Sequence, residues 1–173
     1  MQYYAIQVMS GREDRFIEMG NALLDTEGSK FFTPKRELQT KKNGVKKRRL
    51  YPVFTGYVFL ETNEISIKMC NDLKRIKYFS KILPNTKSPR SLTENDLVYI
   101  KHFLNFGNVA RISKATFNEN NRIVILEGAL KGLEGKIIKV DKRKGRAKVQ
   151  LDMYKDSFSI DFGFEVIQSI DKN

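Results

Sequence analysis

The chain has 173 residues, which suits one medium-sized domain or two small ones. Apolar residues make up 40% of it and aromatic residues 11%, so wholesale disorder is excluded. The formal net charge is +12, from 32 Lys+Arg and 20 Asp+Glu. A positive excess of this size favours a partner rich in phosphate or carboxylate, although a soluble protein can also be basic without one.

The chain has too few cysteine and histidine residues for a disulfide or a metal site, and no sequence pattern of a catalytic nucleophile with its base. A single cysteine, Cys70, cannot form an intramolecular disulfide, and with the single histidine, His102, it cannot close a metal site. No serine or cysteine nucleophile with a neighbouring base is apparent, and no glycine-rich loop leads into a helix with Lys-Ser/Thr. We therefore expect no catalytic residues, no metal and no cofactor, and hence no enzyme.

The N-terminal segment indicates where the protein resides. Residues 2–9 (QYYAIQVM) are typical of a buried strand and differ from a signal peptide. No apolar run approaches the ~20 residues that a membrane span requires. We expect a cytoplasmic protein, a monomer with no membrane partner.

A helix is expected after this first strand. Residues Ser10 to Glu13 fit a capping box, in which the serine oxygen and the glutamate satisfy backbone N–H groups of the first turn. Apolar residues then recur with helical spacing at Phe16, Met19 and Leu23.

Residues 31–61 favour strands. Pro34 restricts its neighbour to the extended region, and Asn43-Gly44 is a strong hairpin-turn signal. The strand at 49–51 leads to Pro52, and residues 53–61 (VFTGYVFLE) predict a central, mostly apolar strand.

The next elements alternate in type. Ile65, Met69, Leu73 and Ile76 predict one face of a helix that includes Cys70, and residues 79–83 predict a short strand. A second capping box at 91–94 opens a helix with Leu97, Ile100 and Leu104 on its apolar side. The order of elements indicates an α+β domain over residues 1–110 with a mostly antiparallel sheet.

The remaining third of the chain shows no helical spacing of apolar residues and is typical of short strands. We expect a linker at 111–119 and an all-β domain at 120–173. Strands are predicted at 122–126, 136–141, 147–153, 158–162 and 165–168, with a tight loop holding Gly128, Gly132 and Gly135. Five short strands in about 50 residues favour a small closed barrel, which has no free sheet edge.

Two segments together resemble the NusG family of transcription factors. Residues 52–59 (PVFTGYVF) resemble the core motif of the family's N-terminal domain. Residues 126–137 and 140–141 are similar to a KOW motif, a strand, a glycine loop and a second strand. KOW loops also occur in ribosomal proteins, so the order and spacing of both motifs support the resemblance.

The resemblance implies a fold and a mechanism. The fold is an α/β N-terminal domain of the RNA-recognition type followed by an SH3-like KOW barrel. The N-terminal domain would bind the clamp helices of RNA polymerase and suppress pausing or termination. The KOW domain would bind RNA or a partner protein such as NusE or Rho. An RNA-binding, ribosome-associated KOW protein is the alternative from another class.

The sequence departs from the family pattern in several places. Thr55 replaces the usual proline, Tyr3 stands where tryptophan is common, and the loop after Tyr154 is shorter and lacks its glycine. Phe162 matches the family's C-terminal Asp-Phe and is expected to bind a partner, but Gly163-Phe164 looks like an added residue. These departures favour a specialised, operon-specific paralogue of the LoaP type, acting through a structured leader RNA, with general NusG as the alternative.

Three aromatic residues are the predicted polymerase contacts. Phe54 and Tyr57 match family positions that form an apolar pocket against the clamp helices, and Tyr3 is a further candidate. Residues three apart in a strand face opposite sides unless a bulge intervenes, and Gly56 makes a bulge plausible. The alternative is that these rings belong to the core of the sheet.

Basic residues of two segments are the predicted nucleic-acid contacts. Residues 1–118 hold 21 Lys+Arg against 11 Asp+Glu, whereas residues 119–173 hold 11 against 9. The predicted hairpin could meet upstream DNA or RNA through Lys41, Lys42, Lys46, Lys47, Arg48 and Arg49, or be merely solvated. The C-terminal domain could position RNA, or dock on a protein, through Lys131, Lys136, Lys139, Lys142, Arg143, Lys144, Arg146 and Lys148.

Overall fold

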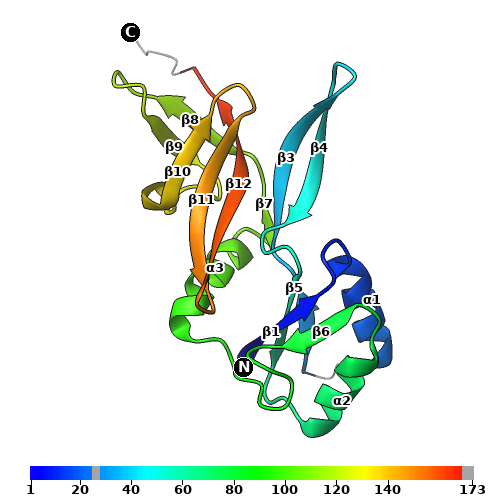
Figure 1. Ribbon diagram of the computed structural model, residues 1–173. Helices are drawn as coiled ribbons and strands as arrows, with labels where there is room; N and C mark the ends of the chain where they lie inside the picture. Colours follow the sequence, from blue (N-terminus) through cyan, green and yellow to red (C-terminus); the bar gives the residue numbers. More distant parts are fainter. Residues whose placement is uncertain (25–27, 169–173) are drawn as a thin grey trace. The chain divides into compact units, whose positions relative to one another are not determined.

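The computed structural model describes residues 1–24 and 28–168 and contains two compact units. The first unit combines Met1–Thr33 with Phe54–Leu97, and the second combines Pro34–Val53 with the chain from Val98 onward. The N-terminal part is mixed α/β and the C-terminal part is β-rich, which confirms the predicted fold class (Figure 1).

The first unit is built on a four-stranded sheet with the order β2-β5-β1-β6. Its strands are β1 (Gln2–Val8), β2 (Lys30–Phe32), β5 (Tyr57–Thr62) and β6 (Phe79–Ile82). Neighbouring strands are antiparallel, as predicted, and Ile6 lies opposite Val58 at the centre of the sheet.

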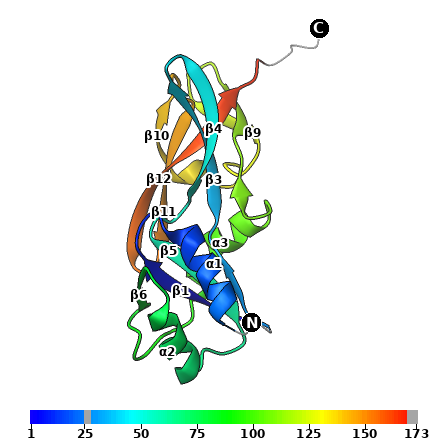
Figure 2. The same ribbon diagram turned by 90° about the vertical axis from the view of Figure 1, so that its right-hand side faces the viewer.

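Two helices cover one face of this sheet, α1 (Glu13–Leu23) and α2 (Ile67–Arg75) (Figures 1 and 2). Alternate residues of the strands point toward them, so Tyr4, Ile6 and Val8 join Val58 and Leu60 in the core. The predicted apolar faces of the helices supply Phe16, Cys70, Leu73 and Ile76. Cys70 is therefore a small buried hydrophobe, and burial raises the pKa of its thiol.

The first helix begins differently from the prediction. Arg12 is the cap residue of α1 and makes no side-chain cap hydrogen bond, so the capping box expected at Ser10 is absent. Glu13 is buried instead, and its Oε1 accepts a hydrogen bond of 2.6 Å from the backbone N–H of Gly56. A long-range bond to the Thr55-Gly56 turn has replaced the local cap.

The third helix, α3 (Glu94–Leu104), begins with a capping box that is shifted by two residues from the predicted one. The Thr93 N–H donates to Asp96 Oδ2 at 3.0 Å, and the Asp96 N–H donates to Thr93 Oγ1 at 3.3 Å. Thr93 and Asp96 thus form the reciprocal side-chain to backbone bonds that were predicted for Ser91 and Glu94.

The strand predicted at 53–61 is shorter in the structure. The strand β4 (Val45–Pro52) ends at Pro52, residues 53–56 form a turn, and β5 starts at Tyr57. Gly56 has φ of +84°, which an extended strand does not accommodate, and the Tyr57 N–H donates to the Phe54 carbonyl at 3.2 Å. The chain therefore turns at Gly56, where a bulge was expected.

The second unit contains the predicted hairpin. Strands β3 (Lys35–Lys42) and β4 pair antiparallel through the expected Asn43-Gly44 turn. The short strand β7 (Val109–Ala110) pairs with β3 in parallel, so this sheet has the order β4-β3-β7.

The second unit also holds residues 98–104 of α3 and a five-stranded sheet in the order β10-β11-β12-β8-β9. Its strands are β8 (Ser113–Phe117), β9 (Ile123–Glu127), β10 (Ile137–Asp141), β11 (Arg146–Met153) and β12 (Asp156–Val166), and a 3-10 turn, η1 (Glu134–Lys136), precedes β10. The alternation predicted for 147–153 is confirmed, because Ala147, Val149, Leu151 and Met153 are all buried.

Two expectations about this sheet differ from the structure. The linker expected at 111–119 contains β8, and the two strands expected at 158–162 and 165–168 are one strand, β12. Phe164 of β12 pairs in parallel with Ser113 of β8, and the N–H of Ile167 donates to the Ala115 carbonyl at 2.9 Å. Ser113 and Ala115 are buried. Their alternate spacing is a weak strand signal in the sequence, because the residues around them are mostly polar.

Candidate functional site

Tyr3 and Tyr57, two of the predicted polymerase contacts, lie on the same face of the first unit's sheet. Tyr3 pairs with Glu61 and Tyr57 with Gln7, so both point away from the face that α1 and α2 cover. Both side chains are half-buried. The register of β1 and β5 thus brings together two residues that are 54 positions apart in the sequence.

Phe54 joins the same group of rings, but it is fully buried. Its ring meets Phe59 edge-on with the centroids 5.9 Å apart, Phe59 lies 5.6 Å from Phe32, and Phe32 lies 6.2 Å from Tyr3. The prediction that Phe54 is a surface contact is therefore wrong for this conformation. It is a core residue linked to Tyr3 through the rings of Phe59 and Phe32, and it meets Phe59 in the edge-to-face geometry that aromatic pairs favour.

The hydroxyl of Tyr3 has a defined orientation. It donates a hydrogen bond of 2.8 Å to Glu61 Oε1 on the neighbouring strand. This bond to a carboxylate, together with partial burial, raises the pKa of Tyr3 above its ordinary value. The phenol is thus neutral at physiological pH, and its ring is fixed against the sheet.

The six cations of the hairpin fall on two sides of it. Lys47 and Arg49 line a hollow with Tyr51, whereas Lys46 lines a different one, as the alternation of side chains along β4 requires. Lys41 and Lys42, the last two residues of β3 before the tip, are exposed. The hairpin therefore presents positive charge in two directions.

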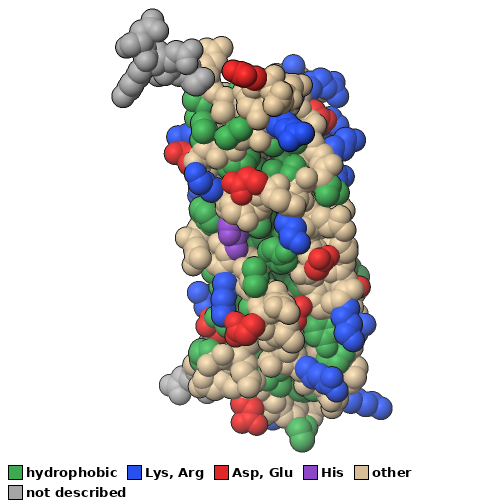
Figure 3. All heavy atoms as spheres, turned by 90° about the vertical axis from the view of Figure 1, so that its left-hand side faces the viewer, with side chains coloured by type: hydrophobic (Ala, Val, Ile, Leu, Met, Phe, Trp, Pro, Cys, Tyr) green, Lys and Arg blue, Asp and Glu red, His purple; other side chains and the backbone are tan. Residues whose placement is uncertain are grey.

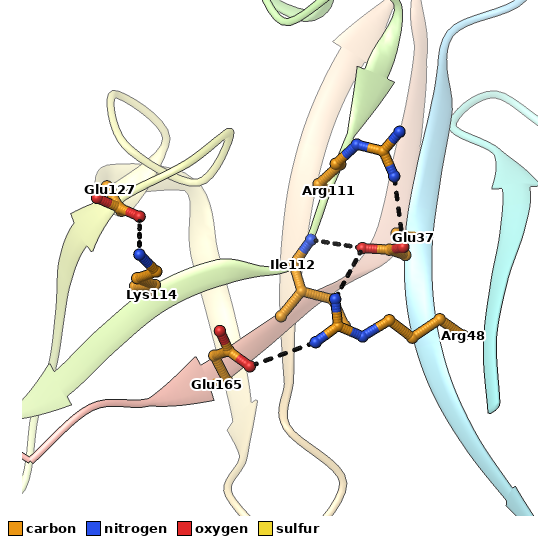
Figure 4. Close-up of polar contacts among 7 residues, drawn as sticks. All are labelled: Glu37, Arg48, Arg111, Ile112, Lys114, Glu127 and Glu165. Atoms are coloured by element: carbon orange, nitrogen blue, oxygen red, sulfur yellow. Dashed lines mark hydrogen bonds and ion pairs between the residues drawn. The ribbon is translucent and has the colours of Figure 1, made fainter. Parts of the chain in front are cut away.

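Arg48 does not extend freely into solvent. Its guanidinium lies 3.6 Å from Glu165 Oε2 of β12 and 3.9 Å from Glu37 Oε2 of β3 (Figure 4). It joins the hairpin to the five-stranded sheet, so its predicted role as a nucleic-acid contact is the weakest among the six.

Glu37 is the centre of this polar junction and was not predicted. It is a buried carboxylate that accepts the N–H of Ile112 at 3.2 Å and lies 3.6 Å from the guanidinium of Arg111 (Figure 4). A buried charge needs such partners to offset its desolvation. Nothing in the local sequence distinguishes Glu37 from an exposed glutamate on a strand, because all these partners except Arg48 are more than seventy residues away.

The cations of the five-stranded sheet are only partly available. Arg146 and Lys148 both lie within 4 Å of the Asp161 carboxylate, at 3.9 and 3.8 Å. Lys142 lies over the Phe117 ring at 3.8 Å and donates to Asn121, and Lys131 donates to the Leu126 carbonyl at 3.3 Å. The other predicted cations, Lys136, Lys139, Arg143 and Lys144, are exposed.

The basic turn between β10 and β11 is ordered by an acidic side chain. Asp141 Oδ1 accepts the backbone N–H of Lys144 at 2.9 Å, and this bond holds the pKa of the carboxyl below its usual range. Because the pKa is lowered, the hydrogen bond persists at neutral pH and is lost as the pH falls through that lowered value.

We therefore expect Asp141 to titrate below the ordinary range of an aspartate, which ¹³C NMR of the side-chain carboxyl can measure. The Lys144→Ala variant keeps the backbone N–H, so most of the lowering should remain. Titration of the wild-type carboxyl at an ordinary value would contradict the assigned hydrogen bond.

Phe162, the predicted partner contact, is buried. Its ring is stacked on Phe103 of α3 with the centroids 5.4 Å apart and the planes 13° from parallel. The structure therefore assigns Phe162 to the core of the second unit, and its binding of a partner stays a prediction.

The described residues contain no group of three His, Cys, Asp or Glu side chains placed to hold a metal ion. No helix within 1–24 and 28–168 is long and apolar enough to cross a membrane.

The fold defines a class of two-part protein, with an α/β N-terminal part and a β-rich C-terminal part. The first carries an aromatic sheet face, and the second carries basic turns. Residues 1–101 match the family model NusG, described as "Transcription termination factor nusG". Because this match spans more than half of the chain, the protein belongs to the NusG family, and it is a factor of transcription elongation or termination.

One solved structure shows how far the fold is shared. The chain is similar to the structure titled "Domain interaction in Thermotoga maritima NusG", with 18% identity and a TM-score of 0.60. The similarity covers 94% of this chain and 93% of that one, so the fold is common to both over nearly their full length. Among curated proteins, a search gives no significant match.

Proposed function

We propose that the protein binds the clamp helices of RNA polymerase through the aromatic sheet face of its first unit and suppresses pausing or termination. The observation that carries this proposal is the family match over residues 1–101, which includes Tyr3, Phe54 and Tyr57. The second unit binds RNA, and the protein acts in the cytoplasm as a monomer.

The aromatic face suits a helical partner. Tyr3 and Tyr57 are half-buried on a base of fully buried rings, so each presents a rigid apolar edge and a polar hydroxyl. Tyrosines of this kind give large contact areas at a low cost in side-chain entropy and are enriched in protein interfaces. The buried Phe54 supports the face from beneath and does not itself touch the partner in this conformation.

The excess of positive charge favours an operon-specific role of the LoaP type over that of a general NusG. The face drawn in Figure 3 presents acidic and basic side chains interspersed, whereas the β10–β11 turn places Lys142, Arg143 and Lys144 in succession. Such a concentration of cations supports contact with RNA phosphates. Because Phe162 is buried, docking of NusE or Rho on that residue has no support in this conformation.

Retention of core RNA polymerase by the immobilised protein tests the first part of the proposal. We expect the wild type to retain the enzyme and Tyr57→Ala with Tyr3→Ala to weaken retention at least tenfold, because tyrosine is enriched among interface residues whose truncation costs about 2 kcal/mol or more, and about 1.4 kcal/mol is a factor of ten. Ile67→Ala is the matched control, since Ile67 is 82% exposed on α2, a helix of the opposite face. Equal retention by both variants, or none by the wild type, would contradict the proposal.

A transcription assay distinguishes the two members of the family. An operon-specific factor should suppress termination only on templates that encode its structured leader RNA. Equal activity on templates with and without any leader would favour a general NusG.

A further inference from the structure

The hairpin and the five-stranded sheet enclose a cleft within the second unit. It has a volume of about 730 Å³ and is lined by residues 39–41 and 46, next to the hairpin tip, on one wall and by the β10–β11 turn with residues 164–166 of β12 on the other. Its lining includes six cations, Lys41 and Lys46 from the hairpin and Lys142, Arg143, Lys144 and Arg146 from the turn. The two basic segments, about a hundred residues apart in the sequence, therefore face one space.

The cleft contains little negative charge to neutralise these cations. Glu165 is the only acid among its lining residues, and it is already paired with Arg48 at 3.6 Å. Within the part of the chain that the structure describes, the side chains of Lys41, Lys46, Arg143 and Lys144 have no hydrogen-bond or ion-pair partner. Both walls thus present an excess of positive charge, which Asp141 beside Arg143 and Lys144 offsets only in part.

The strand register of the hairpin places two of these positive charges close together. Lys41 and Lys46 are directly opposite each other across β3 and β4. Like charges in directly opposed positions destabilise a sheet. A bound anion that lies between the walls would offset the repulsion, which is the expected signature of an anion-binding surface.

The two walls are fixed to each other by specific contacts. Arg36 Nη1 donates to the Asp161 carbonyl at 2.5 Å, and Arg48 reaches Glu165. The backbones approach so closely at Gly163 that a Cβ there would lie 2.8 Å from the Glu37 carbonyl oxygen. Gly163, one of the residues that looks added relative to the family pattern, therefore permits this arrangement.

We propose that the hairpin tip and the β10–β11 turn form one composite site for the phosphate backbone of a nucleic-acid duplex, such as an RNA stem. This inference rests on the proposed RNA binding and deepens it, because it adds the hairpin as the second wall. One strand of the duplex lies in the cleft, with Lys41 and Lys46 on one side of its phosphates and Arg143 and Lys144 on the other.

A duplex fits this lining better than a single strand does. Sites for single strands combine positive charge with aromatic side chains on which bases stack. The only aromatic residue that lines the cleft is Phe164, and it is 4% exposed. Contacts with phosphates alone suit a helix whose bases are already stacked and paired.

Fluorescence anisotropy of the full chain tests the site with three probes, a 16-base-pair RNA stem, a DNA duplex of the same sequence and one RNA strand. We expect the duplexes to bind at one copy per protein and at least tenfold more tightly than the strand. Arg143→Gln with Lys144→Gln should lower duplex affinity about tenfold at low salt. Each lost phosphate contact should reduce the slope of log affinity against log salt by about 1.

Neighbouring residues of β4 supply a matched control for the hairpin wall. Lys46 lines the cleft and Lys47 lines the hollow on the other side, and the two substitutions remove the same charge. We expect Lys46→Gln to weaken duplex binding severalfold and Lys47→Gln to leave it nearly unchanged. Equal effects of the two, or two duplexes bound per protein, would overturn the composite site.

Gly163→Ala tests the geometry without changing any charge. The added methyl group should separate the walls and weaken duplex binding, with the folded state checked by circular dichroism. Wild-type affinity in a folded Gly163→Ala protein would overturn the inference, and so would binding of the single strand as tightly as the duplex. If the variant does not fold, the comparison of Lys46 with Lys47 decides alone.

The same binding experiments also distinguish a failure of this inference from a failure of the proposed function. Duplex binding that depends on the turn but not on Lys46 would leave RNA binding intact and remove only the hairpin wall. Loss of polymerase retention would affect the proposed function alone. Tighter binding of RNA than DNA would assign the cleft to a transcript, and the reverse would assign it to duplex DNA; either result supports a duplex-backbone site.

Discussion

Replacing Phe162 by alanine should lower the free energy of unfolding of the second unit by about 3–5 kcal/mol. The side chain is 2% exposed and stacked on Phe103, so its removal leaves a cavity between β12 and α3. Urea denaturation together with hydrogen exchange of the β11 amides measures the effect where it occurs. A partner-binding residue at the surface would instead leave stability nearly unchanged.

Val166→Ala is the control on the same strand. Val166 is 53% exposed, and surface substitutions usually change stability by less than about 0.5 kcal/mol. If Phe162→Ala were no more destabilising than Val166→Ala, Phe162 would not belong to the core.

Gly128→Ala should be the second severe substitution, with a loss of about 3 kcal/mol. A Cβ at Gly128 would lie 2.6 Å from Ser113 Oγ and 2.8 Å from Ser113 Cα, which is backbone and cannot move aside easily. Its φ of +102° adds strain for any L side chain. Overpacking typically costs about 1–3 kcal/mol and a left-handed backbone about 1–2 kcal/mol more.

The same loop provides the comparison. Gly135 has open space around its Cβ position and no positive φ, so Gly135→Ala should be close to neutral in the same urea experiment. Similar losses for both variants would show that the loop, rather than the contact of Gly128 with Ser113, determines stability.

The first unit could be predicted well from its sequence because its periodicities are strong and its contacts follow from them. The apolar run in 2–9 identifies a buried strand and the helical spacing in 65–76 a buried helix face, and the structure confirms both. The turn at Gly56 was misjudged, because its stabilising partner is the distant carboxylate of Glu13. A sequence pattern detects local repeats, whereas this hydrogen bond joins residues 43 positions apart.

The candidate site was predicted in its residue types but not in its arrangement. The basic segments at 41–49 and 142–148 were identified from composition, yet which cations are neutralised depends on Asp161 and Glu165 across the sheet. The aromatic candidates were identified from the family motif, but neither the shared face of Tyr3 and Tyr57 nor the burial of Phe54 was visible, because the motif does not reveal the strand register or what covers Phe54.

The parallel pairing of β8 with β12 determines where this chain can be divided. A fragment that starts at residue 119 would lack β8, the strand with which β9 pairs in the described part of the chain. It would also expose the backbone of Phe164, Glu165 and Val166 as a free edge, and unpaired edges of this kind recruit other chains into aggregates. Any separately expressed C-terminal fragment should therefore begin before Ser113.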